Sequence, residues 1–134
     1  MDISVRKTEY TVEDRSWLGS RDGTEFTRSV TLDVSAFDQA THYPNGYIPS
    51  GTVLGRITAT GLYGPYNNAL NNGQEVAEGF LFNSTQVRAG GPDVGAPLQW
   101  RGVIRTSRLP IQSTAPGGLD ANARADLAAK FRFE

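Results

Sequence analysis

The stretch IPSGTVLGRITATGLYGPYN, residues 48–67, carries the strongest structural signal in the chain. It holds four glycines, three β-branched aliphatic residues, two tyrosines and a single charge, Arg56. Its middle part alternates with the period of a β-strand, which predicts one face drier than the other: Val53, Gly55, Ile57 and Ala59 against Thr52, Leu54, Arg56 and Thr58. Glycine and proline close the stretch at both ends. The stretch therefore predicts scaffold rather than a reactive site.

Composition sets limits on the class of protein. The chain has 134 residues, 38% of them hydrophobic, which is enough for one core. The 13 basic and 14 acidic side chains give a net charge of -1, so no long-range field favours nucleic acid or an anionic membrane. The absence of cysteine excludes disulfides and thiolate metal sites and suits a reducing compartment. We expect one domain without a signal peptide, a membrane span or a nucleic-acid partner.

Turn residues divide the chain into short β-prone segments. Fifteen glycines and seven prolines are spread along the sequence, as is typical of a mainly β domain. The residues between them predict strands at 3–12, 26–34, 52–59, 75–82 and 98–105. Residues 13–25 are rich in charges and turn residues, which predicts a loop in which Trp17 and Leu18 stand out as apolar.

The hydrophobic period changes only near the C-terminus. There the apolar residues recur every four positions, at Leu119, Ala123, Leu127 and Phe131. Asp120 is a suitable N-cap, and two glycines break the chain just before it. One helix is predicted over about 119–131. The fold class predicted is mainly β: a compact small β-barrel or sandwich-like body with one C-terminal helix and an extended N-terminal arm.

Residues with catalytic chemistry are few. His42 is the only histidine, and its place beside Tyr43 and Pro44 predicts a partly exposed turn residue. Glu75 and Glu78 are three residues apart in a predicted strand, so they should point to opposite faces and form no carboxylate pair. Neither a nucleophile motif nor a phosphate-binding loop is present. The sequence predicts a protein that is not an enzyme and that has no cofactor and no metal site.

The run SGTVLGRITATGLYGPY, residues 50–66, followed by GQEVAEGFLF at 73–82, resembles the signature of bacteriophage head decoration proteins. This capsid-stabilising family includes the decoration protein of phage lambda. Three further segments are similar to the longer members carried by phages of actinobacteria: residues 14–37, 94–110 and 118–131. The similarity covers roughly residues 11–133. The chain departs from the short lambda type in its longer segment before the first signature glycine, Gly51.

The resemblance implies a non-enzymatic protein that assembles, typically as trimers, on the outer surface of the head. Its partners would be the major capsid protein and further copies of itself, and it would be made in the host cytoplasm. On this basis residues 1–24 are predicted to be an N-terminal arm and loop, and residues 25–134 a single β-rich decoration domain. The signature glycines at 51, 55, 61 and 64 would permit tight turns and close packing.

Two sets of contact residues are predicted. For the capsid they are Ile3, Val5, Tyr10 and Val12, in a segment that could add a strand to a capsid sheet, and Trp17 and Leu18 as an apolar anchor. The first four could instead form an edge strand of the protein's own sheet, and the last two could plug its core. For contacts between subunits they are Tyr63, Pro65 and Tyr66, for which burial inside the monomer is the alternative.

Two other classes of protein remain open. A β-rich carbohydrate-binding or host-surface-adhesion module would also lack an active site, and it would use exposed aromatic side chains for stacking. The two tryptophans are far apart in the sequence, and nothing pairs them. A small β-rich hydrolase would need an acid and a base aimed at one cleft, and no such pair can be chosen from the sequence.

Overall fold

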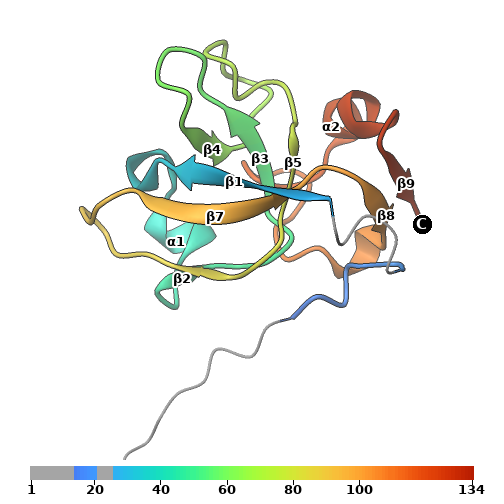
Figure 1. The fold of residues 1–134 in the computed structure, drawn as a ribbon, viewed down its shortest axis with the longest axis horizontal. Coiled ribbons are helices and arrows are strands. Elements are labelled where there is room, and N and C mark those ends of the chain that lie inside the picture. The colour runs from blue at the N-terminus through green and yellow to red at the C-terminus, as the bar shows by residue number, and fades with distance from the viewer. Residues whose placement is uncertain (1–13, 21–25) are drawn as a thin grey trace, which may run out of the picture.

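The computed structural model describes residues 14–20 and 26–134 of the chain (Figure 1). The strand predicted at 3–12, with the contact candidates Ile3, Val5, Tyr10 and Val12, lies outside these residues. The described part is mainly β, as predicted. Its strands are β1 (Thr27–Leu32), β2 (Tyr47–Ile48), β3 (Val53–Arg56), β4 (Tyr63–Pro65), β5 (Gly79–Leu81), β6 (Thr85–Gln86), β7 (Val94–Gln99), β8 (Gly102–Ile104) and β9 (Phe131–Phe133). Its helices are η1 (Val34–Ala36), α1 (Gln39–His42), η2 (Thr106–Arg108) and α2 (Ala121–Leu127).

Five strands close into a barrel in the order β1, β4, β3, β5 and β7. β1 and β4 run parallel, and the other neighbours run antiparallel. The longest ladder joins β1 to β7, from Thr27 opposite Gln99 to Leu32 opposite Val94. Two small sheets flank the barrel, β2 with β6 and β8 with β9. Helix α2 and strand β9 lie together on one side of the molecule (Figure 1).

The wall formed by β3 and β5 is buried on both faces. Val53 is opposite Phe80 in the ladder, and both side chains are fully buried outside the barrel. Leu54 and Leu81, the next residue in each strand, point into the barrel and are also fully buried. The predicted contrast between a dry and a wet face is therefore wrong for β3. A strand that is covered on both sides has buried residues on both faces, as Val53, Leu54 and Gly55 are, and only Arg56 at the end of β3 is exposed.

Two hydrophobic clusters share this wall. The barrel interior holds Val30, Leu32, Phe37, Tyr43, Ile48, Leu54, Tyr63, Leu81, Ala96 and Leu98. The outer cluster holds Trp17, Val53, Tyr66, Ala77, Phe80, Ile104, Leu119, Ala123, Leu127 and Phe131. The outer cluster thus joins the barrel wall to the C-terminal segment and to Trp17, which the sequence assigned to the arm and loop.

The C-terminal helix is shorter than predicted. Asp120 is its N-cap, as expected, and the Asp120 side chain accepts a hydrogen bond from the backbone N–H of Ala123 at 2.8 Å. α2 ends at Leu127, and Phe131 lies in β9, which pairs in parallel with β8. No helix within residues 14–20 and 26–134 is long and apolar enough to cross a membrane.

Two predicted strands are shorter or divided. The segment 98–105 contains the end of β7 and all of β8, which belong to different sheets, with Trp100 and Arg101 between them. In the segment 75–82 only Gly79–Leu81 is a strand. Glu75 and Glu78 lie before that strand, so the argument from strand period does not apply to them. Glu75 instead accepts a hydrogen bond from the backbone N–H of Gly73 at 2.7 Å.

Candidate functional surfaces

The signature glycines build the barrel wall. Gly55 in β3 is directly opposite Gly64 in β4, and Gln74 packs across both. The Gln74 side chain is buried, donates to the Pro65 carbonyl at 2.9 Å and accepts from the Asn72 amide at 2.9 Å. A Cβ on Gly55 would lie 2.8 Å from backbone atoms of Gln74. The close packing predicted for these glycines is present, and it is internal to the monomer.

Trp17, predicted as an exposed anchor for the capsid or as a plug of the core, lies in the core. It is 1% exposed, its ring stacks on Phe80 at 5.5 Å between centroids, and its indole N–H donates to Ser50 Oγ at 3.1 Å. The Trp17 carbonyl accepts from the Arg105 N–H at 2.6 Å, and Gly19 donates to the Val103 carbonyl at 2.8 Å. Segment 17–19 thus pairs with β8. An indole ring gains more from this apolar site than from water, which explains the burial.

Leu18, the second predicted anchor residue, lies beside Trp17 and is only partly buried. It forms an isolated antiparallel bridge with Ile104, and its side chain packs against the outer cluster. A capsid contact through this residue stays a prediction.

Tyr66, one of the three predicted subunit contacts, ties the barrel to α2. It is 2% exposed, and its hydroxyl donates to Asp120 Oδ1 at 2.9 Å. The same carboxylate oxygen caps the helix through Ala123. Burial raises the pKa of the Tyr66 hydroxyl well above its usual value, and the hydrogen bond to Asp120 raises it further. Tyr66 therefore positions the helix inside the monomer.

Tyr63 and Pro65, the other two predicted subunit contacts, are also buried in the isolated chain. The Tyr63 hydroxyl accepts a hydrogen bond from the Arg28 guanidinium at 2.6 Å, which joins β4 to β1. The alternative of burial inside the monomer therefore describes all three residues in the single chain. Contacts between subunits at these positions stay a prediction.

His42 is buried, not partly exposed as predicted. Its Nδ1 accepts from the backbone N–H of Asp38 at 2.9 Å, and its Nε2 lies 2.6 Å from the carbonyl of Pro116. A neutral imidazole with the proton on Nε2 satisfies both contacts. His42 joins α1 to the segment before α2, and its ring nitrogens are both occupied by backbone groups.

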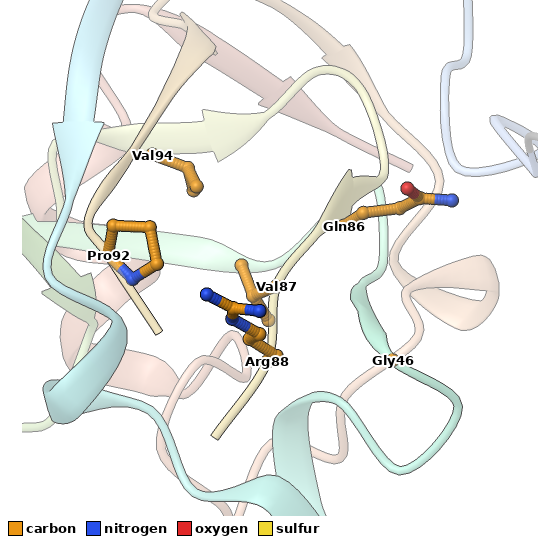
Figure 2. Close-up of a pocket in the computed structure, with 6 residues that line it drawn as sticks. All are labelled: Gly46, Gln86, Val87, Arg88, Pro92 and Val94. Atoms are coloured by element: carbon orange, nitrogen blue, oxygen red, sulfur yellow. The ribbon is translucent and has the colours of Figure 1, made fainter. Parts of the chain in front are cut away.

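One hollow of about 360 Å³ lies between the small β2–β6 sheet and the start of β7. Figure 2 shows Val87, Arg88 and Pro92 around it, with the Gln86 amide turned away from the others. Its described lining residues offer one guanidinium and one amide and include no carboxylate, imidazole or hydroxyl. This set cannot supply a general acid and base. Within the described part of the chain, no three His, Cys, Asp or Glu residues gather as a metal site would require.

The structure also brings together aromatic side chains that the sequence did not single out. Phe26 is 38% exposed and makes an edge-on contact with Trp100 at 5.4 Å between centroids. Trp100 lies between two strands of different sheets, where the alternation is interrupted. The dipeptide Trp100-Arg101 was the available signal, because tryptophan and arginine are both enriched at interfaces.

The structure is a small closed barrel whose wall is joined to a short helix by the outer cluster. Its class is that of a compact structural domain in which the signature glycines Gly55 and Gly64 form part of the barrel wall. Comparison with known families agrees with this class: residues 17–132 match the family model of the bacteriophage lambda head decoration protein D. The chain belongs to this family. Searches of curated proteins and of solved structures gave no match. Membership supports a role in phage head decoration and implies association with the capsid of the virion.

Proposed function

We propose that the protein binds the outer surface of a mature phage head as trimers and stabilises the lattice of the major capsid protein, without catalysing a reaction. The observation that carries the proposal is the family match over residues 17–132, which includes the barrel, the outer cluster and most of the C-terminal segment. The protein would be made in the host cytoplasm, in keeping with a chain that has no cysteine.

The expected stabilisation of the head comes from the many copies of the protein that bind one capsid lattice. A protein that binds only the intact lattice lowers the free energy of that state by mass action. A trimer that contacts several capsid subunits gains from effective concentration, so modest contacts at each site add up over a shell. No enzymatic step is needed for this effect.

The carbohydrate-binding alternative has less support from the geometry. Trp17 stacks on Phe80 inside the core, so it cannot stack on a sugar in this state. Trp100 is the only other tryptophan in the chain, so a sugar could stack on at most one tryptophan.

The test uses heads of the phage that encodes this chain, prepared without the protein, to which purified protein is added back. We expect electron microscopy to show added density in threes on the outside of the head, and DNA release on heating to occur at a higher temperature. The Leu127→Asp variant, which places a charge in the outer cluster, is the matched control and should neither bind nor protect. Equal heat resistance with and without bound wild-type protein would contradict the stabilising role.

A further inference from the structure

A second hollow, of about 670 Å³, lies on the side of the molecule where α2 and β9 are found (Figure 1). Residues 100–103 form one wall, and residues 128–132 form the other. These walls include parts of β8 and β9, which pair with each other, and Trp100 and Lys130 also line a neighbouring hollow. The volume is in the range of sites that hold a few side chains of a ligand.

The lining of this hollow is basic. Arg101, Lys130 and Arg132 line it, and none of the described lining residues is Asp or Glu. Three positive charges thus gather in one place on a chain whose net charge is -1. Two carboxylates, Glu78 and Asp126, line the neighbouring hollow, which shares Trp100 and Lys130 with this one. The Asp126 carboxylate accepts a hydrogen bond from the backbone N–H of Ala77 at 3.1 Å.

Aromatic rings support two of the three cations. The Lys130 Nζ lies 5.4 Å from the centre of the Trp100 ring, and the Arg101 Cζ lies 4.9 Å from that of Phe26. A ring face attracts a cation but does not satisfy its hydrogen-bond donors, so the Lys130 ammonium can still pair with an anion. The rings also restrict the cations, which lowers the entropy lost when an anion binds.

We propose that this basic hollow binds an acidic peptide segment exposed on the capsid, with Lys130 and Arg132 pairing with its carboxylates and Trp100 packing against its side chains. This inference rests on the proposed function. A peptide fits better than a nucleic acid, because the net charge of -1 gives no field for a polyanion and the cations occupy one hollow rather than a stripe.

The first test needs no capsid. A ten-residue oligoglutamate and single-stranded DNA of ten nucleotides are titrated into the full-length protein by calorimetry. We expect the peptide to bind and the double variant Lys130→Glu/Arg132→Glu to bind it about tenfold or more weakly. The control Arg56→Glu/Arg88→Glu makes the same change in charge at two residues that are not among those lining the hollow. Arg56 is the last residue of β3, and Arg88 lies on the loop between β6 and β7, which is on the other side of the molecule from β9 (Figure 1). It should bind like wild type.

The second test measures binding of the same proteins to heads that lack the decoration protein. All four substituted side chains are exposed, so the variants should melt like wild type. Loss of head binding in Lys130→Glu/Arg132→Glu and not in the control supports the inference. Wild-type-like binding by that variant overturns the inference and leaves the decoration function intact. Failure of wild type to bind heads overturns the decoration function itself. Absence of peptide binding, or DNA binding tighter than peptide binding through the same residues, also overturns the inference.

Discussion

At the scale of single residues, the barrel wall depends on glycines, because their lack of a side chain lets another segment pack closely against the strands. Gly55 and Gly64 face each other across β3 and β4, and the buried Gln74 fills the space where their side chains would be. The Gln74 amide then satisfies the Pro65 carbonyl. The backbone of the segment that contains Gln74 can therefore pack directly against the barrel wall. This close contact explains why the stretch at 48–67 has glycines at these positions rather than reactive side chains.

Replacing Gly55 with Ala should destabilise the protein by about 1–3 kcal/mol, because the new Cβ would meet the backbone of Gln74, which cannot rotate away. Gly95→Ala is the matched control: the nearest atom to its Cβ would be the Val30 carbonyl oxygen at 3.9 Å, so its effect should stay within about 0.5 kcal/mol. Urea unfolding of both variants measures the difference. Equal stability of the two would show that the loop over Gly55 can move without cost.

The sequence predicted close packing at the signature glycines but not their partner. Glycine spacing signals that something must come near, and turn residues at 71–73 signal that the chain reverses there. Neither signal says that Gln74 crosses the wall, because this depends on how two loops meet in three dimensions. For the same reason Trp100 and Phe26 were not recognised as neighbours. They are far apart in the sequence and meet only because β1 pairs with β7, which places Thr27 opposite Gln99.

At the scale of elements, α2 is held by its N-terminus and by one face. Asp120 accepts from the backbone at Ala123 and from the Tyr66 hydroxyl, so one carboxylate both caps the helix and joins it to the barrel. Ala123 and Leu127 then bury the inner face in the outer cluster. A helix of seven residues is too short to be stable alone, so these tertiary contacts must supply its stability.

Tyr66→Phe should change the alkaline stability of the protein. The pKa of Tyr66 is raised by burial and by the bond to Asp120, so above the usual tyrosine pKa of about 10 the folded state holds this proton more tightly than the unfolded state. Its contribution is full below about pH 10 and is lost as pH rises further. The variant should be less stable by about 1–3 kcal/mol at pH 7. Its unfolding free energy should fall less steeply above pH 10, and parallel curves would contradict the assignment.

Leu127→Asp tests which surface α2 packs on. Leu127 is 3% exposed in the outer cluster, so an aspartate there would bury an unpaired charge at a cost of several kcal/mol, enough to unfold a marginal domain. Ala125→Asp, on the exposed side of the same helix, should melt within a few degrees of wild type. If Leu127→Asp kept wild-type melting and lost only head binding, the helix face would be an interface.

The C-terminal segment shows what periodicity can and cannot predict. The four-residue spacing correctly identified Leu119, Ala123, Leu127 and Phe131 as buried together. It did not distinguish a continuous helix from a short helix followed by a strand, because both bring Phe131 back to the same cluster. The sequence of β9, Phe-Arg-Phe, has the alternation of a strand, and pairing with β8 decides the outcome.

At the scale of the whole molecule, the hydrophobic core extends beyond the barrel to a segment that precedes its first strand. Trp17 fills the outer cluster from a segment that precedes β1, and its carbonyl pairs with Arg105 after β8. The apolar pair Trp17-Leu18 in a charged loop was a correct signal of an apolar partner. Whether that partner was the capsid or the core could not be read from the sequence, because the cavity that accepts the indole is formed by Phe80 and Ser50, far along the chain.

This arrangement predicts two different truncation results. Deleting residues 2–13 keeps Trp17, so the protein should melt within a few degrees of wild type, while head binding should weaken if Ile3, Val5, Tyr10 and Val12 contact the capsid as predicted from the sequence. Deleting residues 2–18 also removes the indole and its pairing with β8, and loss of a buried tryptophan alone costs about 3–5 kcal/mol. Trp17→Ala in the full chain should therefore lower the melting temperature as the longer deletion does.

Calorimetry on the three variants, with binding to undecorated heads measured in parallel, separates the two roles. Wild-type melting of the longer deletion would place Trp17 outside the stabilising core, and wild-type head binding by the shorter deletion would move the capsid contact to the body of the protein.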